Sequence, residues 1–141
     1  MEKSSGSEII VTVGLPASGK TTWARVLVET SPTTIVRVNR DDIRRMLGPY
    51  WVPKREKLVT AIERSMVYDA IQQGYSVVID ATNFCYTYFE LYAQTQGVTF
   101  RVKDFTHVSL EVCIERDSKR QEPVGKEVIE RMYNKYLKDK I

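Results

Sequence analysis

A glycine-rich segment is the feature that most limits what this chain can fold into. Residues 14–21 read GLPASGKT and match the pattern GxxxxGK[ST] in full. An apolar, β-branched run precedes the segment at residues 9–13, and the residues after it predict a helix. A chance glycine-rich turn needs no such flanks, whereas a phosphate-binding loop requires a strand before it and a helix after it. We therefore interpret the segment as a phosphate-binding loop.

The residue types in this loop suit the phosphates of a nucleotide. Gly14 and Gly19 allow backbone amides to turn inward around a phosphate, and the N-terminus of the helix adds partial positive charge. Lys20 would reach the β- and γ-phosphates, and Thr21 would offer its hydroxyl to Mg²⁺. We expect ATP or another nucleoside triphosphate as phosphoryl donor, with Mg²⁺. The residues expected to hold this donor are Gly14, Ala17, Ser18, Gly19, Lys20, Thr21 and Thr22.

Alternating strands and helices predict an α/β sandwich around a parallel sheet. The expected strands occupy residues 9–13, 34–38, 75–79 and 98–102. The expected helices occupy about residues 19–30, 41–47, 53–73, 87–94, 110–119 and 126–138. The apolar face of the longest helix should comprise Leu58, Ile62, Met66 (or Ser65) and Ala70. Because right-handed crossovers place the loops after the strands along one edge of the sheet, we expect the ligands at that edge.

Size and composition indicate one soluble domain. The 141 residues fit a single domain at residues 8–141, after a disordered lead-in at residues 1–7. The net charge of +3 favours a polyanionic partner only weakly. Cys85 and Cys113 are too far apart for a CxxC pair and fit reduced thiols in the cytoplasm. The chain shows neither a run long enough to cross a bilayer nor a signal peptide, so we expect no membrane partner.

Several charged side chains follow the second predicted strand. Residues 38–44 read VNRDDIR, which puts Asp41 at the sheet edge that carries the phosphate loop. A hydroxyl that accepts a phosphoryl group needs a carboxylate to orient it and take its proton. Arg44 lies three residues further on, on the same helix face, where it could hold an anionic part of the acceptor. The alternative is a helix N-cap at Asp41 or Asp42, with Arg44 as a solvated surface charge.

Further segments in the same order extend the pattern along nearly the whole chain. They read GLPASGKTTWAR from residue 14, VNRDDIR from 38, VIDATN from 78, RDSKR from 116 and VIERMY from 128. Together they resemble the kinase domain of the phage T4-type polynucleotide 5′-kinase family, within the broader group of P-loop kinases. The resemblance implies a three-layer P-loop kinase sandwich with a sheet of about four strands in the order 2-3-1-4 and an arginine-bearing helical lid.

The resemblance also implies roles for the residues near the acceptor. Asp41 matches the general base that activates a 5′-hydroxyl, and Arg44 matches the arginine that holds the neighbouring phosphate of the acceptor. Lys20 and Thr21 match the catalytic pair of the phosphate loop. With Arg120 of the lid, Lys20 and Asp41 make up the expected catalytic side chains.

The lid segment carries two of the matching arginines. Arg116 and Arg120 match residues that grip the donor phosphates in this family. Because they are four residues apart, both would point the same way on a helix, where they would stabilise transition-state charge and help to exclude water. A solvated basic helix face is the alternative, and basic runs usually mean that.

The loop after the third predicted strand offers further polar groups. Asp80 ends the strand and could support Mg²⁺ directly or through a bound water, or it could only cap the loop. Thr82 and Asn83 follow on the acceptor side, where they could bind a nucleic-acid backbone or serve as ordinary loop residues.

Aromatic residues leave two alternatives open. They cluster at residues 84–92 and again at Tyr50 and Trp51, which lie between two prolines. Such rings could stack on bases, or they could pack against the core, which is the commoner use. Trp23 fits a core position in the first helix.

The expected activity is ATP- and Mg²⁺-dependent transfer of the γ-phosphate to the 5′-hydroxyl end of DNA or RNA, as in end healing. The absence of a DxDGT motif predicts no 3′-phosphatase activity. The first alternative is a P-loop kinase for another hydroxyl, on a nucleoside, a small molecule or a hydroxymethylated base. The second is a module that only binds or hydrolyses ATP. The resemblance associates such a chain with a phage or bacterial cytoplasm, while the choice of DNA or RNA and the oligomeric state stay open.

Overall fold

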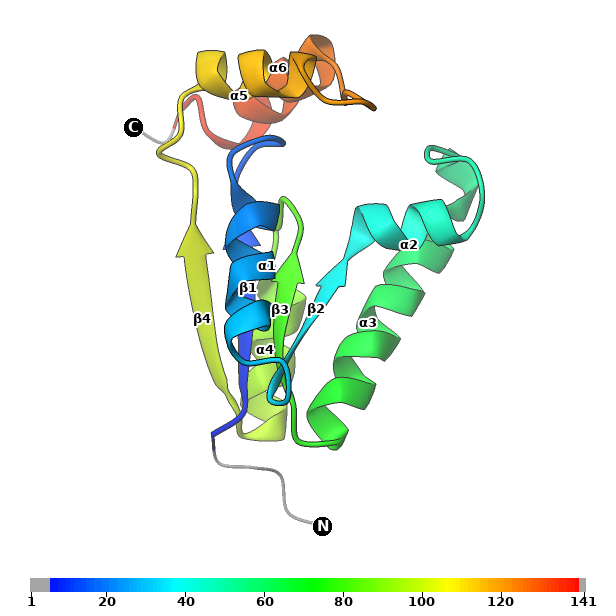
Figure 1. Ribbon diagram of the computed structural model, residues 1–141, viewed down its shortest axis with the longest axis vertical. Coiled ribbons are helices and arrows are strands. Elements are labelled where there is room, and N and C mark those ends of the chain that lie inside the picture. The colour runs from blue at the N-terminus through cyan, green and yellow to red at the C-terminus, as the bar shows by residue number, and fades with distance from the viewer. Residues whose placement is uncertain (1–5, 140–141) are drawn as a thin grey trace.

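A parallel sheet of four strands forms the centre of the fold. The structure is a computed structural model that describes residues 6–139. The strands are β1 (Glu8–Val13), β2 (Ile35–Asn39), β3 (Ser76–Asp80) and β4 (Thr99–Asp104). They pair in the order β2-β3-β1-β4, and every pairing is parallel (Figure 1). This confirms the α/β class and the strand order that the resemblance implied, so the loops after all four strands begin at one edge.

Helices follow the strands in regular alternation. They are α1 (Lys20–Thr30), α2 (Arg40–Met46), α3 (Glu56–Gln72), α4 (Thr87–Gln96), α5 (Leu110–Ser118) and α6 (Lys126–Tyr136). The helix expected from residue 53 instead begins as a short 3-10 turn, η1 (Pro53–Arg55), before α3 starts. Helix α1 covers one face of the sheet, α3 and α4 lie on the other side, and α5 and α6 lie across the carboxyl ends of the strands (Figure 1).

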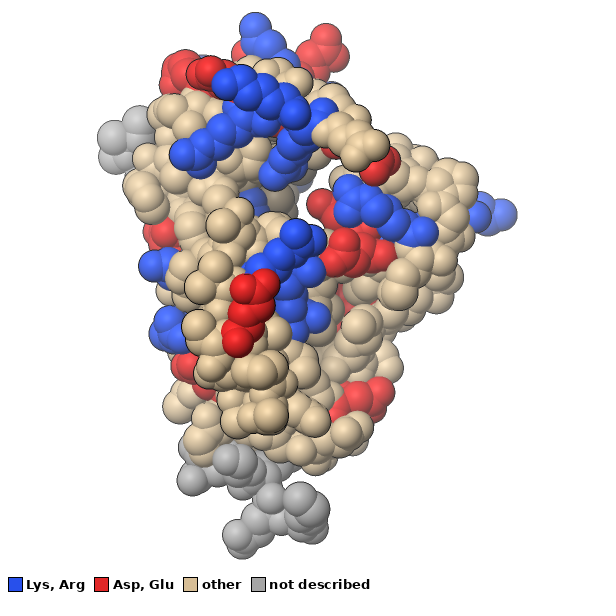
Figure 2. Space-filling view, in the orientation of Figure 1, with Lys and Arg blue, Asp and Glu red and all other residues tan. Residues whose placement is uncertain are grey.

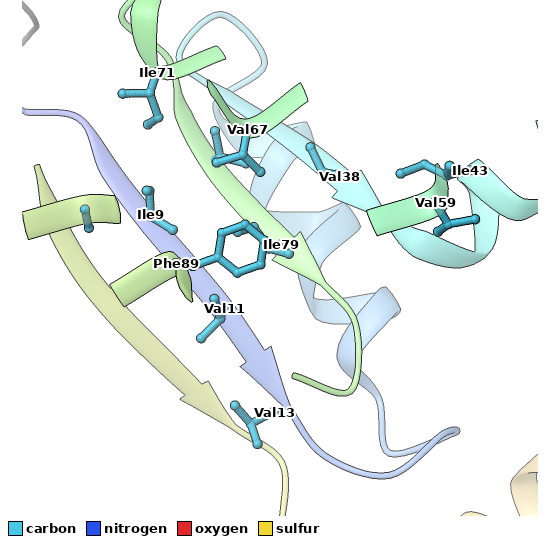
Figure 3. Packing of buried hydrophobic residues seen from close by; sticks show 12 residues of the cluster. Ile9, Val11, Val13, Val38, Ile43, Val59, Val67, Ile71, Ile79 and Phe89 are labelled. Atoms are coloured by element: carbon cyan, nitrogen blue, oxygen red, sulfur yellow. The ribbon is translucent and has the colours of Figure 1, made fainter. Parts of the chain in front are cut away.

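Strand β1 is buried on both faces, which explains its continuous apolar run. Ile9 and Val11 pack with Val67 of α3 and Phe89 of α4 on one side (Figure 3). Ile10, the residue between them, packs against α1 on the other side. A strand covered on both faces is held rigidly, so the loop that follows it at residue 14 starts from a fixed position.

The predicted apolar face of the long helix was wrong by about one position. Leu58 and Met66 are 50% and 39% exposed. The residues that α3 buries are Val59, Glu63, Val67 and Ile71. The charged residue Glu63 interrupts the apolar pattern of this face, so a search for hydrophobic residues misses it. Glu63 can be buried because it forms an ion pair of 2.7 Å with Arg40, which lies 23 residues earlier in the chain. Ile62 lies at the margin of the true face.

Of the lead-in expected at residues 1–7, positions 1–5 lie outside the described residues. Ser7 is buried, and its hydroxyl donates to the carbonyl of Gly74 at 3.1 Å. Between residues 6 and 139, no helix is long and apolar enough to span a membrane.

Candidate active site

The glycine-rich loop leaves β1 and closes tightly before α1. A Cβ on Gly14 would lie 2.8 Å from Oγ of Ser18 and 2.9 Å from Cβ of Phe105, so a side chain at this position would displace the loop. Ala17 has a φ of 65°, an uncommon value for a residue with a side chain. Backbone of this kind often marks functional loops. Phe105, just after β4, was not singled out in the sequence, because its contact with Gly14 joins segments far apart in the chain.

The N-terminus of α1 is open to an anion. Gly19 precedes the helix with a φ of 105°, and no side chain caps the first turn. The amides there therefore have no side-chain acceptor, and the helix dipole adds positive potential.

Lys20 lies inside the loop in an unusual state for a lysine. Its side chain is buried, and its Nζ donates to the carbonyl of Leu15 and to Oγ of Ser18. Burial lowers the pKa of Lys20 to about 8, although the nearby carboxylate of Asp80 opposes this shift. An anionic ligand in this loop would therefore stabilise the charged form of Lys20.

A cavity of about 580 Å³ opens in front of this loop at the carboxyl edge of the sheet. Figure 2 shows a hollow in this region, between α5 and α6 at the top and α2 on the right, with acidic and basic side chains around it. The cavity brings together these predicted site residues: Ala17, Lys20, Thr21, Asp41, Arg44, Asp80, Thr82 and Arg120. Its lining does not include Gly14, Ser18, Gly19, Thr22, Asn83 or Arg116.

Asp80 anchors the floor of the site. Its Oδ2 accepts a hydrogen bond from the Thr21 hydroxyl at 2.8 Å and from Asn39 at 3.1 Å. Arg37 of β2 adds an ion pair to the same oxygen at 2.9 Å. Within residues 6–139, Oδ1 of Asp80 has no hydrogen-bond partner. The sequence did not indicate a role for Arg37, because a position in a strand does not reveal that its partner is Asp80, 43 residues away.

Asp41 lines the cavity and uses one of its two carboxylate oxygens for hydrogen bonds with the described residues. Its Oδ1 accepts from Nη1 of Arg44 at 2.7 Å and from the hydroxyl of Tyr50 at 2.8 Å. Its Oδ2 accepts no hydrogen bond from any described residue. The capping alternative is wrong, because Asn39 caps α2 by accepting from the amide of Asp42 at 2.8 Å. Asp41 is therefore not required to hold the helix end.

Tyr50 and Trp51 both line the same cavity. Burial and the charge of Asp41 raise the pKa of Tyr50 to about 12, so the phenol remains a hydrogen-bond donor to that carboxylate. The Trp51 side chain is 58% exposed, with the Arg44 guanidinium 5.4 Å from its ring centre. An exposed ring at a cavity wall suits stacking better than core packing.

Arg44 lies in the expected cavity but has partners of its own. Its Nε and Nη2 donate to the two oxygens of Glu56 at 2.9 and 2.6 Å, and Nη1 donates to Asp41. This pairing lowers the pKa of Glu56 below its usual range. A phosphate held by Arg44 would have to share or replace these carboxylates.

The lid, defined as α5, α6 and the loop between them, places its two arginines differently. The prediction that both share a helix face was wrong, because α5 ends at Ser118 and Arg120 lies in the loop beyond it. Arg120 lines the cavity, 3.7 Å from Asp117, while Arg116 stays on α5 outside the lining. A grip of Arg116 on the donor stays a prediction.

Asp117 holds the lid loop and was not singled out in the sequence, where it looks like part of a solvated charge run. Its side chain is buried, and its two oxygens accept from the amides of Val124 and Gly125 at 2.9 Å each. Replacing Asp117 with alanine is expected to lower the free energy of unfolding by about 2 kcal/mol, because two amides lose a charged acceptor. Urea denaturation checks this, with Glu115→Ala as the exposed control. Equal, small losses for the two variants would contradict the role of Asp117.

Asn83 uses its amide within the fold. Its Nδ2 donates to the carbonyls of Thr12 and Ile79 at 2.9 Å each, and its φ is 47°. These bonds fix the loop that presents Thr82 to the cavity. Contact of Asn83 with a substrate stays a prediction.

Most of the aromatic side chains in the segment after Asn83 pack against other parts of the protein. Phe89 is buried in the core, and Phe84 stacks on Tyr136 with ring centres 4.6 Å apart. Tyr88 differs, because 44% of it is exposed. Trp23 packs beside the core cluster of α1, as expected.

The fold and the loop define a P-loop kinase architecture: a parallel sheet in the order 2-3-1-4, a GxxxxGKT loop after β1 and a lid across the strand ends. The chain belongs to the AAA domain family AAA_33, whose family model matches residues 9–138.

Two curated relatives cover most of this chain. A protein of the Autographa californica nuclear polyhedrosis virus, named as a bifunctional polynucleotide kinase/RNA ligase, is 28% identical over 154 residues, covering 95% of this chain and 21% of the relative. The L-seryl-tRNA(Sec) kinase of Methanococcus maripaludis is 25% identical over 138 residues, covering 91% of this chain and 52% of that protein.

A solved structure of the Pnkp1/Rnl/Hen1 RNA repair complex contains a similar chain. The TM-score is 0.73 and the identity 28%, and the match covers 95% of this chain and 45% of the other. This chain thus spans about half, or less, of the length of each of these proteins.

Proposed function

We propose that the protein transfers the γ-phosphate of ATP to the 5′-hydroxyl end of DNA or RNA. The observation that carries the proposal is the free oxygen of Asp41, which shares one cavity with Lys20 and Thr21. A protein that only binds ATP needs no such carboxylate opposite its phosphate loop. The names of the viral relative and of the RNA repair complex support a nucleic-acid end as acceptor.

The donor phosphates would lie on the amides of the first turn of α1, with Lys20 turning from the Leu15 carbonyl to the β- and γ-phosphates. Thr21 and Asp80 would hold Mg²⁺. The Thr21 hydroxyl donates a hydrogen bond to Asp80, so the lone pairs of its oxygen remain for a cation, and Oδ1 of Asp80 could hold a metal-bound water. Mg²⁺ usually takes one or two protein groups together with phosphates and waters, and this pair fits that pattern. When bound, the ion would neutralise charge on the phosphates.

The acceptor hydroxyl would approach Oδ2 of Asp41. The hydroxyl oxygen forms a bond to the γ-phosphorus as the bond to the β,γ-bridging oxygen breaks, ADP leaves, and the hydroxyl proton passes to Asp41. Arg44 and Tyr50 fix the carboxylate through Oδ1, which leaves Oδ2 for this task. Arg120 would face the transferring phosphoryl group from the lid, and the Trp51 ring would receive the terminal base.

The pKa of Lys20 predicts how donor binding depends on pH. With a pKa of about 8 in the free protein, Lys20 is mostly charged at pH 7 and loses its charge as the pH rises. Bound phosphates favour the charged form, so binding above pH 8 takes up a proton. ATP affinity should therefore fall by up to about tenfold per pH unit above 8. Calorimetric titrations from pH 7 to 9.5 measure this, and Lys20→Met should bind more weakly and lack the slope. A wild-type affinity that stays constant over this range would contradict the assignment.

A kinase for another hydroxyl is the second candidate. Arg44, the expected phosphate ligand, already donates three hydrogen bonds to Glu56 and Asp41, so a phosphate on the acceptor has to compete with these carboxylates. One relative is named for a hydroxyl carried on an aminoacylated tRNA. An assay with γ-labelled ATP decides between the candidates by comparing 5′-hydroxyl DNA and RNA, nucleosides and small alcohols. Label on a nucleoside or alcohol but on no oligonucleotide would refute the first proposal.

We extend the proposal to a cytoplasmic setting, which suits the two free thiols, exposed Cys85 and buried Cys113.

A further inference from the structure

A second hollow opens directly beside the candidate active site. Its volume is about 570 Å³, and its walls come from α3, α4, α6 and the loop after β3. The residues that line both hollows are Arg40, Ala81, Thr82, Arg131 and Met132. The two spaces are therefore neighbours across a shared wall, and a chain-like ligand in the first could continue into the second.

The second hollow carries an excess of unpaired positive charge. Its one acidic residue, Glu63, is paired with Arg40 at 2.7 Å. Three further cations line it: Arg64, Arg131 and Lys135. None of the three has an ion pair with any residue between 6 and 139. A hollow with three uncompensated cations favours a ligand with several negative charges.

An aromatic surface lies among these cations. Tyr88 lines the hollow and is 44% exposed, and the Arg64 guanidinium lies 3.6 Å from its ring centre. The stacked pair of Phe84 and Tyr136 forms another part of the wall. Cations beside exposed rings are the combination that binds single-stranded nucleic acid, with cations on phosphates and rings on base faces.

We propose that this second hollow, the downstream hollow, binds the nucleotides that follow the 5′-terminal one in a single strand. The inference rests on the proposed function. Arg131, at the junction of the two hollows, would hold the phosphate that links the terminal nucleotide to the next. Arg64 and Lys135 would hold later phosphates, and Tyr88 would stack on an unpaired base. The substrate class is then a single-stranded polynucleotide end rather than a nucleoside, a mononucleotide or a blunt duplex.

The test compares acceptors of different length on the whole protein. The double variant Arg64→Ala/Lys135→Ala is measured against the wild type on a nucleoside 3′-monophosphate and on a single-stranded hexanucleotide. We expect kcat/KM to fall at least about tenfold more on the hexanucleotide than on the monophosphate. The matched control is Arg25→Ala/Lys138→Ala, which removes the same charges from exposed positions outside both hollows. Equal losses on both acceptors, or equal effects of the two double variants, would overturn the proposal.

A binding measurement separates this inference from the proposed function. Fluorescence anisotropy of the hexanucleotide without ATP gives the slope of log Kd against log salt concentration. Loss of two phosphate contacts should reduce that slope by about 1.4, and a merely structural effect would not. If no acceptor is phosphorylated but the slope changes, the downstream hollow stands and the proposed reaction fails. If a blunt duplex is phosphorylated as well as the single strand, the single-strand preference is refuted.

Discussion

Replacing Asp41 with asparagine is expected to lower phosphoryl transfer to a 5′-hydroxyl end by about 100-fold or more. Asparagine keeps an oxygen for the contacts with Arg44 and Tyr50 but cannot take the proton of the acceptor. The effect should appear in kcat, because the lost interaction forms only as the hydroxyl attacks. ATP affinity should stay close to that of the wild type, since the donor lies on the phosphate loop.

Asp42 offers a matched control for this change. It is the next residue, its side chain is 48% exposed, and it pairs with Arg37 and Arg45 outside the cavity lining. Asp42→Asn makes the same chemical change at a residue that does not line the cavity, and because Arg37 keeps its ion pair with Asp80, the variant should keep most of the activity. If Asp41→Asn retained activity similar to that of Asp42→Asn, another group would have to act as the base.

Replacing Arg120 with alanine should lower kcat by about 100-fold, the usual effect of removing one group that stabilises transition-state charge. Arg120 lines the cavity, and its one ion pair within residues 6–139 is the long contact of 3.7 Å with Asp117, so its charge is available to a phosphoryl group. The lid loop should also exclude water less well, so hydrolysis of ATP should rise relative to transfer. Measuring inorganic phosphate and labelled acceptor in the same reaction gives this ratio.

Two neighbouring residues provide the comparison for Arg120. Lys119 is exposed and pairs with Glu115, and Arg116 stays on α5 outside the cavity. Lys119→Ala should have little effect, and Arg116→Ala a smaller effect than Arg120→Ala. If Arg116→Ala caused the larger loss, Arg116 rather than Arg120 would have to contact the transferring phosphoryl group.

The parts of the site that could be predicted are those encoded locally. The phosphate loop is one continuous segment. Asp80 ends β3 and Asp41 lies two residues after the end of β2, so parallel topology alone brings them to one edge. The strand order came from the resemblance rather than from pattern. Helix α5 ended earlier than the spacing of Arg116 and Arg120 suggested, because Asp117 turns the chain by binding two amides of the lid loop.

The parts that could not be predicted depend on long-range pairs of charges. A charged residue such as Glu63 is normally expected at the surface. The ion pair with Arg40 allows it to be buried, and the buried face of α3 therefore differs from the predicted one. Arg44 was expected to hold a phosphate of the acceptor, but Glu56, twelve residues away, accepts hydrogen bonds from two of its nitrogens. Arg131 lies in the segment VIERMY, which contributed to the resemblance but indicated no role for this arginine. Its place at the junction of the two hollows depends on how the lid packs over the sheet.

The most direct test of the central claim follows the γ-phosphate of ATP onto two oligonucleotides of identical sequence. One carries a free 5′-hydroxyl and the other a 5′-phosphate. We predict that label appears only on the oligonucleotide with the free hydroxyl, at its 5′ end, and that Asp41→Asn lowers the rate of labelling by about 100-fold or more. Label released only as inorganic phosphate, or found on small alcohols with none on the oligonucleotide, would contradict the claim.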